Sequence, residues 1–311
     1  MYLSSTDIQG PIKKICVMLA AAEFLVGGLA NGFIGLVNFI DWVKTRRVYS
    51  IDLILTVLAV SRIIFMGSFT SIIIMNSYLD LYADGNPSYL EHLWNLSNHV
   101  SSWFGTCLSI FYFLKITTFS HPAFLWLKWR INKVVLGMMV ISFLISLLIN
   151  LPMTEKINEI YKILAEYKNK ANGTHKMQIN KSHKQIFFFF LIFYHMEGFF
   201  PFGVSIISCF LLVFSLWRHT QQITASRNVS TEVHKKTMKS MVSFLFLYLL
   251  YHLGIIMANV SYVFFESTPA VFLSMLIAAT YPLAHSIILI KENNKLRQAF
   301  LSIVWQLKHC F

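Results

Sequence analysis

Arg62 places a permanently charged guanidinium inside a stretch of chain that is otherwise apolar, LTVLAVSRIIFMGSF at 55–69. An ionisable side chain at bilayer depth is costly, and it usually faces the protein interior or a water-filled cavity. Such residues are therefore candidates for an interhelical polar cluster, a ligand site or a substrate path. The other intramembrane candidates are Glu23, His195, Glu197 and His285, with Asn31, His99 and His252 as polar companions.

Enzymatic catalysis and metal binding explain these residues poorly. The eleven histidines are spread along the chain without ligand spacing. The sequence also contains no HExxH, GxSxG, CxxC or Gly-rich phosphate loop. We therefore expect neither an enzyme nor a metal site, and no cofactor.

The composition indicates which elements must position these residues. The chain is 56% hydrophobic and 13% charged, whereas soluble domains carry roughly 25% charged residues. A bilayer core of about 30 Å needs roughly 20 apolar residues per helix. Seven stretches meet this length: about 15–40, 51–77, 93–116, 134–153, 186–217, 240–264 and 270–290.

We therefore predict an all-α membrane protein, a single seven-transmembrane helix bundle over 1–311. Lys and Arg outside the spans fall mainly on one side if the N-terminus is extracellular, which the positive-inside rule favours. The 154–185 loop would then be extracellular, and it carries glycosylation sequons at Asn172 and Asn180. Residues 291–311 become a cytoplasmic tail, whose apolar residues recur with the spacing of a short amphipathic helix on the membrane surface.

Depth along the predicted spans groups some of the polar residues. Asn31 lies 16 residues into the first span and Arg62 lies 11 into the second, which runs the opposite way. Both reach the inner half of the bilayer, and His285 and Ser286 reach a comparable level late in the seventh span. We expect one buried cluster in which Arg62 donates to Asn31, Ser286 and backbone carbonyls. The cluster could be a passive clamp, a two-state switch, or both.

The outer half of the fifth span holds His195 and Glu197. Residues two apart point in different directions on a helix, so at least one could line an outward-opening cavity. A hydrogen bond to a neighbouring helix is an equal alternative.

Seven stretches of the chain together carry a family resemblance: NGFIGLVN, LTVLAVSR, SWFGTCLSIFYFLK, HPAFLWLKWRI, FSLWRH, KSMVSFLFLY and NNKLRQAF. The resemblance covers six of the seven spans in order. Rhodopsin-like signatures are absent: FYFLKI and HSIILI stand where D/E-R-Y and NPxxY would end spans 3 and 7. These stretches resemble the bitter taste receptors, the taste receptor type 2 family of G-protein-coupled receptors.

The resemblance implies a plasma-membrane receptor that detects bitter small molecules in an outward-facing transmembrane pocket. It implies activation of a heterotrimeric G protein of the gustducin/Gi type, and a glycan in the second outer loop, which matches Asn172. The inner-side residues expected to face the G protein are Tyr112, Lys115, His219, Lys235 and Lys239. Membrane lipids are a further expected partner of the basic tail, and nucleic acid is not.

The pocket residues are also carried over from the resemblance. The family's recurrent tryptophan falls on Trp103, and Cys107 stands where many members carry asparagine. Met275 stands where several members have glutamate, so Glu197 is left as the candidate acid. Trp103 could instead be a membrane-interface anchor. The full set of expected ligand-binding residues is Trp103, Phe104, Cys107, Asn76, Glu197, Tyr251 and Met275.

A transporter of small organic solutes is the alternative from a different functional class, because ionisable residues near the midplane also mark substrate paths. Seven spans do not divide into equal halves, and the sequence shows no internal repeat. A ligand-dependent G-protein signal would favour the receptor, whereas solute uptake without such a signal would favour transport.

Overall fold

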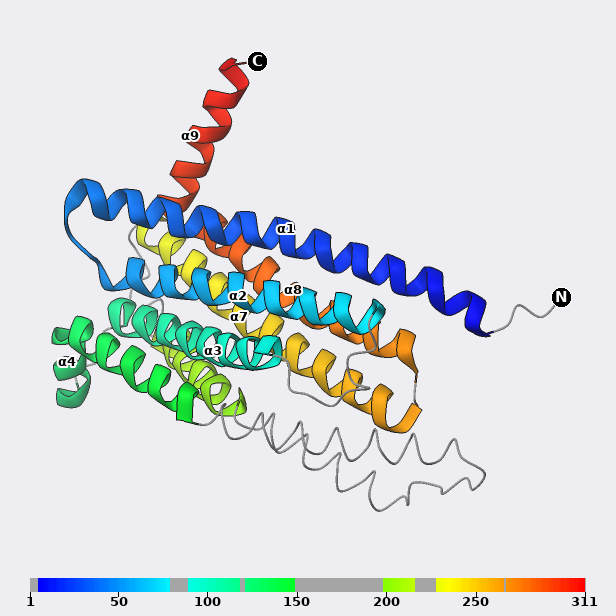
Figure 1. The fold of residues 1–311 in the computed structure, drawn as a ribbon. Coiled ribbons are helices and arrows are strands. Elements are labelled where there is room, and N and C mark those ends of the chain that lie inside the picture. The colour runs from blue at the N-terminus through cyan, green and yellow to red at the C-terminus, as the bar shows by residue number, and fades with distance from the viewer. Residues whose placement is uncertain are drawn as a thin grey trace.

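A computed structural model of the chain describes residues 5–78, 89–117, 121–148, 198–215, 228–265 and 267–310. The long helices lie side by side as one bundle (Figure 1). The labelled helices are α1 (Ser5–Thr45), α2 (Ser50–Tyr78), α3 (Tyr89–Ile116), α4 (Pro122–Trp129), α7 (Asn228–Val260), α8 (Thr268–Glu292) and α9 (Asn294–Cys310). Two further helices are called here the fourth-span helix (Ile131–Leu148) and the fifth-span helix (Gly198–Ser215).

Six helices in the described part of the chain are long and apolar enough to cross a membrane. They are α1, α2, the fourth-span and fifth-span helices, α7 and α8. Their outward surfaces are apolar: Leu25 and Leu29 of α1 and Phe246 of α7 are all exposed. Surfaces of this kind are rare on soluble proteins, and they match the hydrocarbon of a bilayer. The all-α membrane bundle expected from composition is confirmed.

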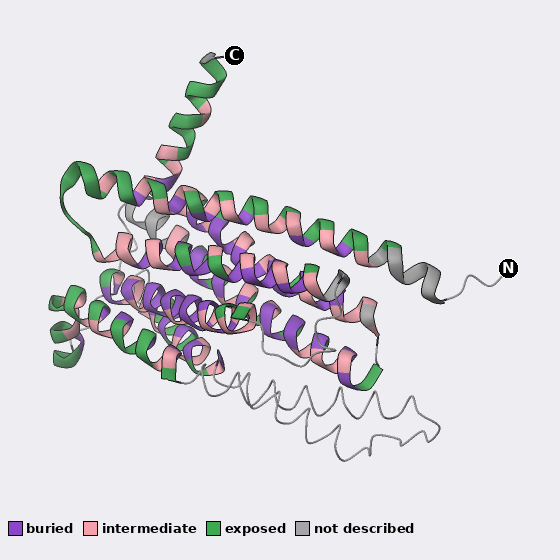
Figure 2. Ribbon diagram, in the orientation of Figure 1, coloured by how far each residue is buried: buried purple, intermediate pink, exposed green. Residues whose placement is uncertain are grey.

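The long helix α3 is not among these six, although many of its residues are buried in the bundle. It packs against α2, and its buried side chains include Asn95, His99 and Thr106. Thr106 donates to the carbonyl oxygen of Pro201 in the fifth-span helix at 2.9 Å. Polar groups buried in this way must find partners on neighbouring helices. Figure 2 shows the buried residues concentrated on the inner surfaces of the bundle, while α1 and α9 carry long exposed faces.

Close contact between α7 and α8 depends on a glycine. A Cβ at Gly254 would lie 2.9 Å from the carbonyl oxygen of Ser274 in α8, closer than side-chain carbons approach. Any larger residue would push the two helices apart. Pro282 lies within α8, where it cannot donate to the helix ladder.

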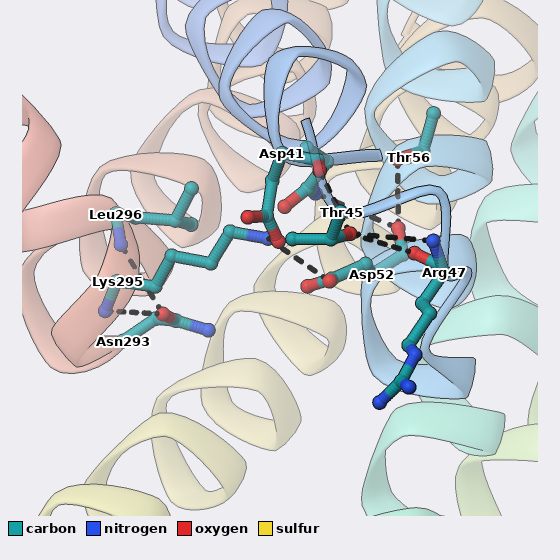
Figure 3. A network of polar contacts seen from close by, with 9 residues as sticks. Asp41, Thr45, Arg47, Asp52, Thr56, Asn293, Lys295 and Leu296 are labelled. Atoms are coloured by element: carbon teal, nitrogen blue, oxygen red, sulfur yellow. Dashed lines mark hydrogen bonds and ion pairs between the residues drawn. The ribbon is translucent and has the colours of Figure 1, made fainter. Parts of the chain in front are cut away.

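An ion cluster, here the Lys295 cluster, joins α9 to the bundle (Figure 3). The Lys295 ammonium contacts Asp41 of α1 at 2.7 Å and Asp52 of α2 at 2.9 Å. Asn293 accepts from the backbone N–H of Lys295 and Leu296, which caps the first turn of α9. Burial lowers the pKa of Lys295, but its hydrogen bonds and charge pairing with the two aspartates outweigh burial and raise the pKa above its ordinary value. The ammonium therefore stays charged at neutral pH.

One cation, the Lys295 ammonium, thus joins α9 to α1 and α2 at this end of the bundle. Leu296 is fully buried, and Phe300 of α9 meets Phe33 of α1 edge-on at 6.0 Å between ring centroids. From this base α9 projects across the direction of the bundle (Figure 1).

Lys295→Met should destabilise the protein more than Asp41→Asn does. The methionine leaves two carboxylates close together without a cation, whereas the asparagine leaves one Lys–Asp pair intact. Each pair is partly exposed and contributes up to about 1 kcal/mol, so the shift in melting temperature should be a few degrees. Thermal unfolding of the purified protein in detergent measures this shift, with Lys308→Met on α9 as the matched control. Equal melting temperatures for Lys295→Met and the control would show that the cluster does not stabilise the fold.

Candidate functional site

Arg62 lies in the half of the bundle nearer α9 and is fully buried, with 0% of its surface exposed. It is held on α2 between α1 and α8, both of which pack against that helix. A guanidinium has five N–H donors and no acceptor, and it remains charged in proteins. Its position therefore requires acceptors from the two neighbouring helices.

Ser286 of α8 is the link between the three helices. Arg62 Nη1 donates to Ser286 Oγ at 3.0 Å. Ser286 Oγ lies 2.8 Å from Asn31 Oδ1 and 2.8 Å from the carbonyl oxygen of Pro282, so its one proton can go to either. Asn31 in turn donates to the carbonyl oxygen of Gly27 in α1. Asn31 thus joins the guanidinium through Ser286, in place of the direct bond that the sequence predicts.

The second guanidinium nitrogen faces two rings of α8. Arg62 Nη2 contacts His285 Nδ1 and lies 3.5 Å from the Tyr281 hydroxyl oxygen. The charged group also lies over the Tyr281 ring, 5.4 Å from its centroid. Because arginine only donates, His285 Nδ1 must accept, which places the imidazole proton on Nε2. His285 is therefore neutral in this arrangement.

Tyr281 is a partner that the sequence reasoning missed. It lies four residues before His285, and residues four apart share one face of a helix. That spacing alone would have added it to the cluster. Together Asn31, Arg62, Tyr281, His285 and Ser286 form what we call the Arg62 network. Every hydrogen-bond partner of Arg62 within the described residues is neutral, so dipoles rather than a carboxylate hold the buried charge.

Trp103 lies on α3 and is half-buried. Its indole Nε1 donates to His99 Nε2 at 3.3 Å. Its ring is 5.7 Å, centroid to centroid, from Phe200 of the fifth-span helix. The structure thus places this side chain between α3 and the fifth-span helix with part of its ring open.

The other expected ligand residues lie in different surroundings. Cys107 and Phe104 are buried in a cluster with α1, α2 and the fourth-span helix. Tyr251 is buried among the rings of Phe65, Tyr248 and Tyr281. Half-buried Met275 packs against a third cluster formed with α1 and α2. Trp94 of α3 borders both the Tyr251 and Met275 clusters, so it connects two parts of the expected site that the sequence reasoning treated separately.

Several expected site residues cannot be placed from the described part of the chain. Glu197, Asn172, Asn180 and His219 lie outside the described residues, as does His195. Asn76 and Lys235 lie in α2 and α7, but their side chains are not described.

Three residues expected to face a G protein can be placed. Lys115 is exposed near the end of α3, with its ammonium 5.4 Å from the centroid of the Phe111 ring. Tyr112 is half-buried and packs between two core clusters. Lys239 of α7 pairs with Glu292 at the end of α8 at 3.2 Å. Lys239 is thus exposed and paired, and it connects α7 to the end of α8.

Ser286→Ala should destabilise the protein by about 1–3 kcal/mol, because it leaves Arg62 Nη1 without this buried acceptor. Adding Arg62→Met removes the charge itself, so the double variant should regain part of the loss. Thermal unfolding in detergent and cell-surface levels measure both effects. Thr280→Ala on α8 is the matched control, since Thr280 donates only within its own helix, to Ile277. Equal losses for Ser286→Ala and Thr280→Ala would contradict the assigned role of Ser286.

Comparison with known proteins places this arrangement in a family. The family model described as taste receptor protein (TAS2R) matches residues 9–308. Taste receptor type 2 member 7 of Papio hamadryas is 42% identical over 304 residues, which is 94% of each chain. The proteins of the same name from Macaca mulatta and Mus musculus are also 42% identical, over 94% of this chain and 93% and 95% of theirs.

Six apolar spans, the polar helix α3 within the bundle and the match over nearly the whole chain agree with one another. The chain belongs to the taste receptor type 2 family and is a G-protein-coupled receptor of bitter taste.

Proposed function

We propose that this receptor binds bitter small molecules in a transmembrane pocket at the end of the bundle opposite α9. The observation that carries the proposal is the placement of Trp103. Its indole nitrogen is satisfied internally by His99, while its ring is partly open beside Phe200. An aromatic face held in this way offers a flat apolar contact to a ligand.

The residues around this site favour apolar, drug-like or plant compounds. Small-molecule sites are mostly apolar clefts with a few polar anchors. Met275 and Cys107 supply no charge, and Glu197 is the candidate acid for ligands that carry an amine. A micromolar agonist would gain about 8 kcal/mol on binding.

Activation requires the ligand to favour one of two receptor arrangements. The arrangement that signals would open the α9 end of the bundle around α3, the fifth-span helix and α7. The Lys239–Glu292 pair joins α7 to the end of α8, so it would separate as α7 moves outward. Lys239 would then be free to meet a gustducin/Gi-type G protein beside Tyr112, Lys115, His219 and Lys235.

The same proposal sets the orientation in the plasma membrane. The N-terminus would be extracellular and the α9 end cytoplasmic, with Asn172 glycosylated on the outer side. The exposed apolar residues of α9, among them Phe300 and Trp305, would lie in the inner lipid interface beside Lys308. This orientation places the Lys295 cluster at the cytoplasmic surface.

Receptor and transporter differ in one direct assay. Cells that express the receptor with a chimeric gustducin-type α subunit should show agonist-dependent calcium signals in a compound screen. Signals should vanish without the α subunit. Solute uptake that is independent of a G protein would support transport instead.

Trp103→Ala should lower potency for the agonists found in that screen by tenfold or more, because it removes the open ring face. A tenfold change corresponds to about 1.4 kcal/mol of binding free energy. Concentration–response curves at matched surface levels measure the shift. Trp42→Ala is the control, since Trp42 is exposed on the outer face of α1. Full potency of Trp103→Ala for every agonist would rule out this pocket.

A further inference from the structure

A continuous chain of hydrogen bonds, here the Trp103 relay, leads from Trp103 to the fourth-span helix. Trp103 Nε1 donates to His99 Nε2 at 3.3 Å. His99 Nδ1 lies 2.6 Å from Ser146 Oγ, and Ser146 Oγ donates to the carbonyl oxygen of Ser142 at 2.8 Å. The relay therefore connects a half-buried side chain to two deeply buried ones.

Hydrogen-bond chemistry gives the relay one direction. An indole nitrogen only donates, so His99 Nε2 must accept and carry no proton. The neutral imidazole then carries its proton on Nδ1 and donates it to Ser146 Oγ. The Ser146 hydroxyl proton remains available for the Ser142 carbonyl oxygen. Every donor in the relay thus has its acceptor, which requires one tautomer of His99.

The burial of the relay separates its members by role. His99 is 4% exposed and Ser146 is 0% exposed, so neither presents a surface to a ligand. Trp103 is the member with an open face. His99 and Trp103 are four residues apart on α3, and their rings meet edge-on with centroids 6.3 Å apart. The two buried residues therefore restrict the rotation of the half-buried indole ring.

We infer that His99 and Ser146 are positioning residues that determine ligand specificity by fixing the orientation of the Trp103 ring. This inference rests on the proposed function, in which Trp103 contacts the ligand. A ring held in one rotamer selects ligands that match its plane and loses little conformational freedom on binding. Without the relay the ring can turn, and the ranking of agonists changes.

The alternative role for His99 and Ser146 is a tie between α3 and the fourth-span helix that acts independently of Trp103. Trp103→Phe distinguishes the two roles, because phenylalanine keeps an aromatic ring but has no N–H to donate. If His99 acts through the indole, replacing His99 matters only when Trp103 is present. If His99 acts as a tie, its replacement has the same effect in both backgrounds.

The test is a double-mutant cycle on His99→Leu and Trp103→Phe, read as agonist potency at matched surface levels for several agonists of different shape. In the wild-type background His99→Leu should lower potency about tenfold for some agonists, which corresponds to the loss of one hydrogen bond. It should also change the order of potencies across the panel. In the Trp103→Phe background it should change potency less than about twofold, because the indole N–H that His99 accepts is already gone. His99→Gln, which can both accept and donate, should restore the wild-type order.

Ser146→Ala provides a second route if His99→Leu fails to reach the surface. It removes the acceptor for His99 Nδ1, so it should shift the panel in the same direction, whereas Ser146→Thr keeps the hydroxyl and should not. Equal potency losses in both backgrounds, for either replacement, would overturn the positioning role while leaving the pocket intact. No effect of Trp103→Ala on any agonist would instead overturn the proposed function itself.

Discussion

A permanent positive charge buried among apolar helices is the constraint on which the rest of this structure depends. Arg62 cannot lose its proton, so α1 and α8 must bring acceptors to it. Ser286, His285 and Tyr281 meet the guanidinium directly, and Asn31 joins through Ser286. These contacts determine how α1, α2 and α8 are placed relative to one another. Because all the described partners are neutral, the charge is balanced by dipoles that can rearrange, which suits either a clamp or a two-state element.

The Arg62 network is accompanied by two other polar assemblies with different tasks. At the α9 end, Lys295 joins the same α1 and α2 to the amphipathic helix through Asp41 and Asp52. Elsewhere in the bundle, the Trp103 relay ties α3 to the fourth-span helix. A further ion pair links α7 to α8, where Lys239 meets Glu292 at the end of α8.

The sequence predicted most clearly the contacts that depend on spacing within one helix or on depth in the bilayer. The level of Asn31, Arg62 and Ser286 along their spans was sufficient to bring them together, and Tyr281 could have been added from its spacing to His285. Contacts that depend on how separate helices rotate were not predictable in this way. Ser146 faces His99, and Lys295 lies between two aspartates, only because of the tertiary packing. The ligand residues carried over from the family remain predictions, and the structure separates Tyr251, Met275 and Trp103 into different surroundings.

The most direct test of the Arg62 network is an experimental density map of the receptor in a lipid bilayer, at a resolution that shows side chains. In that map the Arg62 guanidinium should lie within hydrogen-bond distance of Ser286 and His285, enclosed by α1, α2 and α8. A map in which the guanidinium points toward the lipid, or in which Ser286 faces away from Asn31, would contradict the role assigned to this buried charge.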